Sequence, residues 1–557
     1  GSVAVVGASP RNISGFVLKN LLQGFDGGIY PVNSKYEEMQ GIACYPSVRD
    51  IPESVDLAVI LVPARAVPSV LEDCAQKGVP RVIIESAGFS ESGSEGEELQ
   101  RRCEQIAEEA GMRLWGPNCM GVVDVINSRY FSFMNPEVRE ELLPGRISLI
   151  VQSGMMSAIF LAELGRRGIG VAKACSIGNR ADVDECDVLS YLLDDPDTDA
   201  IALYLESIPR GRSFARLVER SDKPVVLLKG GESRSGAVAA KSHTSSLSGD
   251  SRLMDSVLRM SGVVRAYSVY QMMDMADSLA DIPWVDPACR TAILTLSGGA
   301  GILACDALER CGIRVAGLDS NTKEEVARVF PSWMPVDNPV DLFPAVAQSG
   351  RQVAFEGALS AVLKAPDIDA LVIHYVAGLE EIDLDFNQLR ERAKQEGKVV
   401  LFWLMGREEG SGRFRQGARQ AGIQVYEDVT RLAECLRAVA SFSAHRLQRE
   451  EQQEEAALDS CRQVETPTYS EMVWDEYDSK LLLAEHGVPV VREQLAESAQ
   501  LAEEAAQEMG YPVALKGLVP GRSHKSEAGL VKLGVSDESM LRRCFAELSA
   551  QVGDSGR

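Results

Sequence analysis

His243 stands in the stretch best suited to covalent chemistry, the small and hydroxylated segment GESRSGAVAAKSHTSSLSGD that runs from Gly231 to Asp250. It is one of only five histidines in 557 residues, and Ser242 and Thr244 flank it without bulky apolar neighbours. A histidine nitrogen can accept a phosphoryl group and pass it on when the ring stays accessible. A lone histidine is otherwise more often a packed or surface residue, so neighbouring motifs must support the prediction.

A carboxylate is needed to orient such a ring and to fix its tautomer. Glu206, at the end of the apolar run ALYLE, is the candidate for this role. The alternative reading of Glu206 is an ordinary solvated carboxylate.

Two glycine-containing helix starts offer sites for the phosphoryl group. Ser153 and Gly154 follow an apolar run in VQSGMMSAI, and Gly298, Gly299 and Gly301 belong to LSGGAGI. The N-terminus of a helix carries about half a positive charge and free N–H groups, which suit a phosphate. Each segment also fits an ordinary turn between a strand and a helix.

The N-terminal block predicts a site for a nucleotide-like ligand. The strand-like run VAVVGASP brings Gly7 and Ser9 to a turn, but its spacing departs from G-x-G-x-x-G, which disfavours classical NAD binding. Three further strand ends, YPVN, VPA and GPNCMG, follow in the same block. Ligands of open parallel sheets bind at the carboxyl ends of the strands, where these segments should gather.

The last block contains PVALKG with Lys516 and SHKSEAGLVKLGV with His524 and Lys525. A lysine late in a strand can neutralise nucleotide phosphates, although an ordinary surface lysine is the commoner explanation. The remaining histidines have no motif around them and are interpreted as structural: His374, His445 and His486.

Parallel α/β domains must position these segments. Short β-branched runs such as VAVVGA, RVIIESAG, ISLIVQSG and TAILTLSGG alternate with longer amphipathic stretches. That alternation is typical of βαβ units whose sheets are covered on both faces. It predicts three Rossmann-like or flavodoxin-like domains, then a charged linker and a last domain that we expect to be incomplete. The expected ranges are 1–128, 140–283, 288–445, 446–465 and 466–557.

Composition and charge narrow the function classes. The 57 Lys and Arg against 81 Asp and Glu give a net charge of -24, which repels nucleic acid and anionic membranes. No apolar run approaches the roughly 18 residues that a membrane span needs. We therefore expect a cytoplasmic protein that binds neither nucleic acid nor membrane. The 12 cysteines form no C-x-x-C pair and are interpreted as buried thiols.

In this order the motifs resemble the NDP-forming acyl-CoA synthetases, relatives of succinyl-CoA ligase and of archaeal ADP-forming acetyl-CoA synthetases. The resemblance covers nearly the whole chain. It rests on VAVVGAS, YPVN, GPNCMG, IGNRADVDE, DDPDTDAIALYLES, AAKSHTSSLSG, LSGGAGILACDALE, NPVDL and ALKG followed by SHKSEAGLVKL. It implies a CoA-binding domain, two ligase domains and the first part of an ATP-grasp domain.

The resemblance also implies roles for single residues. His243 matches the phosphorylated histidine, and Glu206 matches the glutamate that holds it. Lys516 is similar to the ATP-grasp lysine, and His524 resembles a histidine proposed to relay phosphate in some members. The implied CoA contacts are Gly7, Ser9, Val32, Asn33, Pro63 and Asn118, and the implied phosphate-binding residues are Ser153, Gly154, Gly299 and Gly301.

The implied reaction joins a small carboxylic acid to CoA and converts ATP to ADP and phosphate, through a phosphohistidine and an acyl phosphate. Mg²⁺ is the implied metal cofactor, and we expect a homo-oligomer, a dimer. The usual SHTGSLAG is SHTSSLSG here, so Ser245 and Ser248 replace smaller residues without removing the nucleophile. The Mg²⁺ ligands would lie beyond Arg557, and a chain that ended there should not use ATP alone.

Two other functions stay open. One is a CoA-binding regulatory module of a protein acetyltransferase, which the presence of His243 and the lack of an acetyltransferase segment disfavour. The other is a lyase that activates a β-substituted acid as its CoA thioester before elimination. Trp333 or Trp403 could then hold a cationic substrate by a cation–π contact, although each also fits a packing role.

Overall fold

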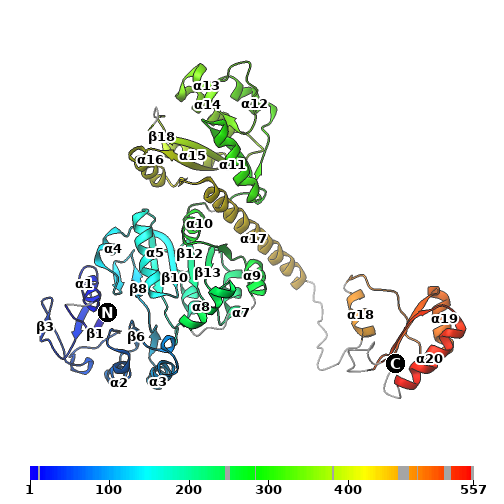
Figure 1. Cartoon of the computed structure of the whole chain (residues 1–557), viewed down its shortest axis with the longest axis horizontal. Helices are drawn as coiled ribbons and strands as arrows, with labels where there is room; N and C mark the ends of the chain where they lie inside the picture. The colour runs from blue at the N-terminus through cyan, green and yellow to red at the C-terminus, as the bar shows by residue number, and fades with distance from the viewer. Residues whose placement is uncertain are drawn as a thin grey trace. The chain divides into compact units, whose positions relative to one another are not determined.

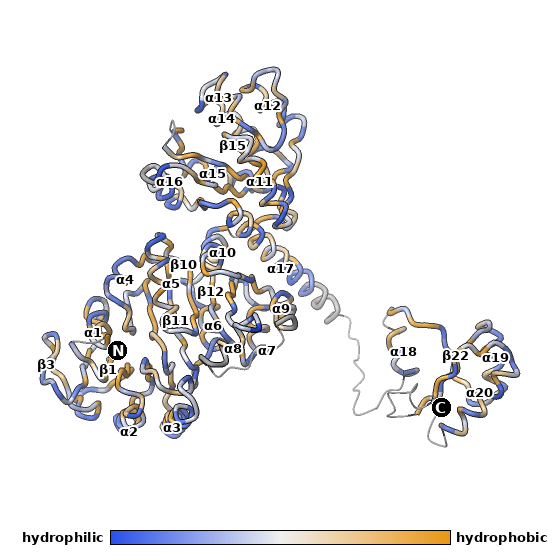
Figure 2. The backbone as a smooth tube through the Cα atoms, viewed as in Figure 1, coloured by the Kyte–Doolittle hydropathy of each residue, from blue (hydrophilic) through white to orange (hydrophobic). Residues whose placement is uncertain are grey.

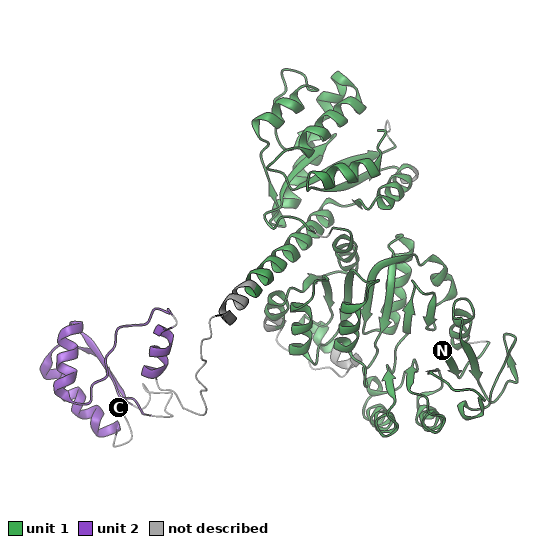
Figure 3. Ribbon diagram, turned by 180° about the vertical axis from the view of Figure 1, so that it is seen from behind, with its two compact units in different colours: residues 1–454 green, residues 455–557 purple. Residues whose placement is uncertain are grey.

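The computed structural model of this chain describes residues 1–10, 13–244, 251–282, 284–378, 382–461, 476–485, 487–519 and 529–552. Within these ranges the side chains of residues 240–244, 251–253, 408–409 and 454–461 are not described. The chain forms two compact units, Gly1–Glu454 and Glu455–Arg557 (Figure 3). Each unit has hydrophobic clusters of its own.

The first sheet of the larger unit is parallel and has the strand order β2-β1-β5-β6-β7 (Figure 1). Its strands are β1 (Ser2–Val6), β2 (Gly28–Val32), β5 (Leu57–Ile60), β6 (Arg81–Ile84) and β7 (Arg113–Trp115). A small hairpin, β3 (Glu38–Met39) and β4 (Ile42–Ala43), follows β2. Helix α1 (Ser14–Leu22) packs on one face of the sheet, and α2 (Val67–Lys77) and α3 (Ser94–Ala110) pack on the other. Because both faces are covered, the strands are apolar along their length.

The second sheet has the order β14-β13-β12-β10-β11-β8-β9. Its five parallel strands are β10 (Pro144–Val151), β11 (Val171–Ser176), β12 (Ala200–Leu205), β13 (Val225–Lys229) and β14 (Val264–Ala266). The strands β8 (Gly121–Asp124) and β9 (Arg129–Phe131) extend it in antiparallel fashion. Its helices are α4 (Pro136–Glu141), α5 (Gly154–Arg166), α6 (Glu185–Asp194), α7 (Gly211–Glu219), α8 (Arg234–Thr244), α9 (Ser251–Met260) and α10 (Val269–Asp281). Helices α5 and α10 cover one face, whereas α6 and α7 cover the other.

The third sheet has the order β16-β15-β18-β19-β20, with β17 paired to β15, and all of its pairs are parallel. The strands are β15 (Arg290–Thr295), β16 (Arg314–Val315), β17 (Val340–Asp341), β18 (Ala370–Ala377), β19 (Val399–Gly406) and β20 (Gln424–Tyr426). The helices are α11 (Gly298–Arg310), α12 (Ser320–Ala327), α13 (Phe343–Ser349), α14 (Arg351–Leu363), α15 (Phe386–Gln395), α16 (Glu408–Gln420) and α17 (Val429–Cys461). Helices α11 and α17 cover one face, and α12, α14 and α15 cover the other.

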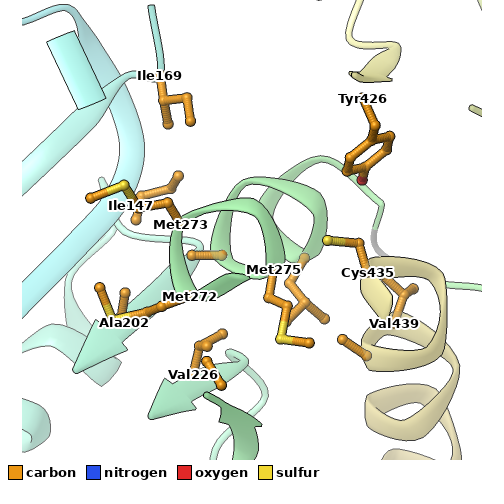
Figure 4. Packing of buried hydrophobic residues seen from close by; sticks show 14 of the residues in the cluster. Ile147, Ile169, Ala202, Val226, Met272, Met273, Met275, Tyr426, Cys435 and Val439 are labelled. Atoms are coloured by element: carbon orange, nitrogen blue, oxygen red, sulfur yellow. The ribbon is translucent and has the colours of Figure 1, made fainter. Parts of the chain in front are cut away.

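Helix α10 joins the second sheet to the third. Figure 4 shows Met272 directed toward Ala202 of β12, while Met275 on the opposite side lies near Val439 of α17. All four side chains belong to one buried cluster. The second and third sheets therefore share a hydrophobic core through α10.

The smaller unit contains the antiparallel pair β21 (Val513–Lys516) and β22 (Val531–Val535). Helices α19 (Ala499–Met509) and α20 (Glu538–Val552) pack against it around Ala506 and Leu541, and α18 (Glu476–Glu485) precedes them. This mixed α/β unit is much smaller than the first.

The observed fold confirms the predicted class of several parallel-sheet domains. Figure 2 shows hydrophobic residues along the interior strands, such as β10 and β12, in agreement with their burial. The described cysteines are free thiols, most of them buried. Among the described residues, every helix is too short or too polar to cross a membrane.

Candidate active site

The predicted CoA-contacting residues gather at the carboxyl edge of the first sheet. Gly7 follows β1 with a φ of 86°, and its N–H donates to the carbonyl oxygen of Val32 at 2.9 Å. A Cβ at Gly7 would lie 2.8 Å from the carbonyl oxygen of Leu61, so only glycine fits this turn. The ends of the neighbouring strands β1, β2 and β5 therefore meet at one point.

Asn33 ties the loops after β1 and β2 together. Its Nδ2 donates to the carbonyl oxygen of Ala8 at 2.8 Å, and its Oδ1 accepts from the N–H of Lys35 at 3.0 Å. Ser9 follows Ala8 and is partly buried at the same turn. The structure thus brings Ser9 and Asn33 to the edge where Gly7 and Val32 lie.

Hydrogen bonds of Ser86 connect the segments that contain Pro63 and Asn118 at this edge. Pro63 precedes a short 3₁₀ turn, Ala64–Ala66, after β5. The hydroxyl of Ser86 donates to the carbonyl oxygen of Val62 at 2.6 Å, and the N–H of Asn118 donates to the carbonyl oxygen of Ser86 at 2.9 Å. The four strand-end segments therefore form one row of contacts, as the sequence predicts for a ligand edge.

Helix α5 begins beside the GPNCMG segment. Ser153 caps the helix, since its Oγ accepts from the N–H of Met156 at 3.4 Å. A Cβ at Gly154 would lie 3.4 Å from the backbone nitrogen of Met120. The predicted phosphate-binding helix start thus lies against a predicted CoA-contacting segment.

Glu206 sits in the turn after β12, next to the start of α5. Gln152, which is buried, accepts from the N–H groups of Glu206 at 2.8 Å and of Ser207 at 3.3 Å through its Oε1. Tyr204 Oη donates to Glu206 Oε1 at 3.5 Å. Burial, together with the Glu206 carboxylate, raises the pKa of Tyr204 to about 12, so its hydroxyl remains a donor at neutral pH.

The strand next to Glu206 leads toward His243. Lys229 ends β13, and its Nζ donates to the carbonyl oxygen of Glu206 at 2.6 Å. Burial lowers the pKa of Lys229 below its ordinary value. Helix α8 follows this strand, and the backbone of His243 lies near its end. The imidazole of His243 lies outside the described side chains, so its contacts with Glu206 stay a prediction.

The second predicted phosphate-binding turn belongs to the third sheet. Thr295 ends β15, and its hydroxyl donates to the carbonyl oxygen of Ser297 at 2.9 Å while accepting from the N–H of Ser297 at 3.0 Å. Helix α11 begins one residue later, with Gly299 exposed and Gly301 buried. His374 on β18 contacts the hydroxyl of Thr295 through Nδ1 at 3.1 Å, and burial lowers its pKa. His374 therefore supports the turn as a buried neutral ring.

In the smaller unit Lys516 lies at the end of β21, where its Nζ is 2.6 Å from Oε1 of Glu476. Both residues line a pocket of about 830 Å³ that also includes Lys480 and apolar side chains of α20 such as Phe545. His524 and Lys525 lie outside the described residues.

One group among the described residues has the composition of a metal site. Ligand atoms of Asp184, Glu185 and Cys186 lie within 4.8 Å of one another. Arg210 pairs with Asp184, and Arg180 pairs with Glu185, so both carboxylates already have cationic partners. The cluster is explained by these ion pairs.

The sequence did not single out Gln152, Lys229, Asn179 or Arg180. Asn179 Oδ1 accepts from Nδ2 of Asn118 at 3.3 Å, and its backbone N–H donates to the carbonyl oxygen of Pro117 at 2.9 Å. Gln152 lies in VQSG, Asn179 and Arg180 lie in IGNRADVDE, and Lys229 ends the apolar run PVVLLK, and these positions were the available signal. Their contacts cross between strands that are far apart in sequence, so spacing alone could not assign them.

Three family models match this chain. A CoA binding domain matches residues 1–124, a succinyl-CoA ligase like flavodoxin domain matches residues 144–279, and an ATP-grasp domain matches residues 468–556. These matches lie in the order that the sequence motifs predicted.

Relatives that align with almost the whole of this chain point to the same family. Acetate–CoA ligase [ADP-forming] I of Archaeoglobus fulgidus is 34% identical over 562 residues, covering 99% of this chain and 79% of the relative. The 4-hydroxybutyrate–CoA ligase [ADP-forming] of Nitrosopumilus maritimus is 30% identical over 560 residues, covering 98% of this chain and 78% of the relative.

A solved structure has the same fold. The dinucleotide forming acetyl-coenzyme A synthetase 1 of Candidatus Korarchaeum cryptofilum, in complex with phosphate and ADP, superposes with a TM-score of 0.71 at 30% identity. The match covers 81% of this chain and 97% of that chain. Together with the row of strand-end loops, these likenesses confirm the resemblance in the sequence: the chain belongs to the ADP-forming acyl-CoA ligases, which are acid–thiol ligases.

Proposed function

We propose that this chain forms acyl-CoA through a phosphorylated His243 whose ring Glu206 orients. One observation carries the proposal: Gly154 lies against Met120, while Gln152, two residues earlier, holds the turn of Glu206. The predicted CoA edge, a phosphate-binding helix start and the orienting carboxylate are therefore joined by direct contacts.

The proposed reaction has three steps. The γ-phosphoryl group of ATP moves to a ring nitrogen of His243, and ADP leaves. A carboxylate oxygen of the acid attacks the phosphorus, which forms an acyl phosphate and frees the histidine. The thiolate of CoA then attacks the acyl carbonyl carbon, and phosphate leaves with the electron pair of the broken C–O bond.

Each step needs charge neutralisation more than covalent assistance. The N-terminus of α5, which begins at Gly154, and that of α11, at Gly298 and Gly299, offer N–H donors to the travelling phosphate. The N–H of Gly301 instead donates within the helix to the carbonyl oxygen of Ser297 at 3.0 Å, so Gly301 is proposed only to let the phosphate approach closely. Tyr204 donates to Glu206 Oε1 and so helps to fix the carboxylate. Lys516 is proposed to neutralise nucleotide phosphates together with Mg²⁺, with His524 as a further relay.

Each domain has its own role in the proposed reaction. Residues 1–128 bind CoA, 140–283 carry the phosphohistidine, 288–445 supply the second phosphate-binding helix, and 466–557 contribute to nucleotide binding. Relatives of similar identity are named for acetate, for 4-hydroxybutyrate and for trans-feruloyl-CoA, which supports a carboxylic acid, aliphatic or aromatic, as substrate. The assembly is proposed to be a homodimer, which light scattering after size-exclusion chromatography would test.

Labelling with phosphate tests the central step. Run in reverse, acetyl-CoA and [³²P]orthophosphate give acetyl phosphate and CoA, and the acetyl phosphate then phosphorylates His243. We expect acid-labile, base-stable label on the wild-type chain, and the same label from [γ-³²P]ATP with Mg²⁺ when the ATP-grasp domain is complete.

The variant His243→Ala should carry no label from either donor. His445→Asn is the matched control, because His445 lies on α17 and outside the proposed site. Label that persists in His243→Ala, or wild-type protein that stays unlabelled with the acyl-CoA of every acid in the panel below, would contradict the assignment. A panel of acetate, 4-hydroxybutyrate and an aromatic acid, assayed for CoA-thioester formation, identifies the acid class.

A further inference from the structure

Arg180 links the loop after β11 to the turn that carries Glu206. Its backbone has a φ of 61°, in the left-handed region that few non-glycine residues occupy. Its side chain is only 8% exposed. Nη1 donates to Oε2 of Glu185 at 2.8 Å and to the carbonyl oxygen of Ser207 at 3.0 Å, and Nη2 donates to Oγ of Ser207 at 2.7 Å.

A strained backbone of this kind costs about 1–3 kcal/mol and persists only where surrounding contacts determine it. Here the contacts are those of the guanidinium together with two backbone hydrogen bonds, from Arg180 N–H to the carbonyl oxygen of Ile177 and from Ala181 N–H to that of Gly116. Glu185 is fully buried at the start of α6, so Arg180 cannot turn away without leaving this carboxylate unpaired in the interior. The side chain is thus fixed at one end by Glu185 and presents its remaining donors to Ser207.

Three side chains hold the turn of Glu206 and Ser207, and one of them, Lys229, donates to the carbonyl oxygen of Glu206. Gln152 accepts from both N–H groups of the turn, and Arg180 donates to the carbonyl oxygen and hydroxyl of Ser207. Gln152 holds the two peptide planes that flank the Glu206 Cα atom, and Arg180 holds the next plane and the side chain of Ser207. Together these contacts set the direction in which the carboxylate leaves the backbone.

The loop of Arg180 is also bound to the predicted CoA edge. The N–H of Asn179 donates to the carbonyl oxygen of Pro117, and the N–H of Ala181 donates to that of Gly116, both at 2.9 Å. A Cβ at Gly178 would lie 2.1 Å from the carbonyl oxygen of Pro117, so the two loops touch directly. Arg180 thus stands between the GPNCMG segment and the Glu206 turn.

We propose that Arg180 is a positioning residue that aims Glu206 through its hydrogen bonds to Ser207. The inference rests on the proposed role of Glu206 in orienting a phosphorylated His243, and it deepens that role. A planar guanidinium can satisfy Glu185 and both acceptors of Ser207 at once, whereas a lysine ammonium is a point charge on a shorter stem. The positive charge alone is therefore insufficient.

The test is Arg180→Lys in the full chain, labelled with acetyl-CoA and [³²P]orthophosphate. We expect the rate of phosphohistidine formation to fall about 10- to 100-fold, since a small misplacement near reacting groups has effects of that size. The KM for acetyl-CoA should stay within about twofold of wild type, because Arg180 donates to none of the residues of the first-sheet edge described above. The control is Arg210→Lys, a half-exposed arginine that pairs with Asp184 and Asp187. It should label at the wild-type rate.

A double-mutant cycle with Glu206→Gln separates positioning from general loss of structure. If Arg180 acts through Glu206, the double variant should label no more slowly than Glu206→Gln alone. Ser207→Ala removes one acceptor of Arg180 and should show a smaller loss, about threefold to tenfold, with the same lack of additivity.

Each outcome decides the inference. Wild-type labelling rates in Arg180→Lys, or rate losses that multiply with those of Glu206→Gln, would overturn it. If Arg180→Lys does not fold, Ser207→Ala decides by the same criteria. Wild-type protein without label removes the proposed function and this inference together, whereas a labelled wild type with unaffected Arg180 variants removes the inference alone.

Discussion

At the scale of single residues, the turn after β1 requires glycine at position 7. Its positive φ disfavours any other residue, and an added Cβ would meet the carbonyl oxygen of Leu61 at 2.8 Å. We expect Gly7→Ala to weaken CoA binding at least about tenfold, because the backbone must shift where β1, β2 and β5 meet. Isothermal titration with CoA measures the effect.

Gly41 supplies the control for this prediction. It has a similar φ of 82° in the β3–β4 turn, but nothing lies within 4 Å of an added Cβ. Gly41→Ala should therefore cost stability without changing the dissociation constant for CoA. Equal affinities for both variants and wild type would show that the Gly7 turn does not contact CoA.

Gln152 is a second residue whose replacement has a defined consequence. Its Oε1 is the acceptor for two N–H groups, those of Glu206 and Ser207. Gln152→Leu would leave them without this acceptor, and each unsatisfied buried group costs about 1–3 kcal/mol. We expect the free energy of unfolding to fall by about 2 kcal/mol in urea titrations. Gln105→Leu, on the exposed side of α3, should change it by less than about 0.5 kcal/mol.

At the scale of secondary-structure elements, α10 carries a buried polar network between the second and third sheets. Asp274 pairs with Arg167 at the end of α5 and with Arg431 on α17. Asp277 lies one turn further along α10, and Arg419 of α16 approaches it at 3.3 Å. The junction thus combines an apolar side, formed by Met272 and its neighbours, with an ionic side.

Asp277 makes this junction sensitive to pH. Burial raises the pKa of Asp277 to about 6, and Asp274 and Asp281 act in the same direction, although Arg419 opposes them. Because the pKa of Asp277 is higher in the folded state than in the unfolded state, the folded state binds the proton more tightly. The stability that this proton binding adds is fully present below the pKa that Asp277 has in the unfolded state. It is lost as pH rises from about 4 to about 6.

We expect Asp277→Asn to remove that part of the pH dependence. The difference in unfolding free energy between the variant and wild type should grow in favour of the variant from pH 4 to pH 6 and then level off. Urea titrations at each pH measure it, with exposed Asp306→Asn as control. Parallel curves for wild type and Asp277→Asn would contradict the prediction.

Most elements could be predicted from the sequence, because runs such as VAVVGA and TAILTLSGG must be buried on both faces to be stable. The antiparallel pairing of β8 with β11 and of β9 with β8 could not, since a short strand contains no signal for its partner. Neither could the left-handed backbone of Arg180 or the contact of its guanidinium with Ser207, which lies 27 residues away. Of the candidate site, the strand-end motifs could be predicted, because glycine and proline residues follow the apolar runs. The side chains that hold Glu206 in place could not be predicted.

At the scale of the whole molecule, the two compact units should unfold separately. The larger unit has a buried cluster shared by the second and third sheets, whereas the described residues of the smaller unit form a small cluster around Ala506 and Leu541. Small cores give marginal stability. We expect two transitions in scanning calorimetry, the smaller one assigned to residues 455–557.

Binding of coenzyme A should shift the unfolding temperature of only one of the two units. A ligand that binds only the folded larger unit at about 100 times its dissociation constant adds about 2.7 kcal/mol to that unit alone. The larger transition should therefore move to higher temperature while the smaller one stays. A single transition, or an equal shift of both, would contradict independent units.

The contact between the loop after β11 and the first sheet has a consequence for how such chains can recombine. The loop donates through the backbone N–H groups of Asn179, Ala181 and Val183 to carbonyl oxygens of the first sheet and its GPNCMG segment. These main-chain contacts do not depend on side-chain identity, but side chains also cross the boundary: Asn179 Nδ2 donates to Glu91 and Gln100, and Arg113 pairs with Asp182. An N-terminal domain from a distant relative should therefore dock on this chain where it keeps these three partners. Gly178 must be kept as well, since a Cβ there would meet the carbonyl oxygen of Pro117. Such an exchange should alter ligand preference at the edge of the first sheet while leaving the proposed phosphoryl-transfer residues of the second sheet intact.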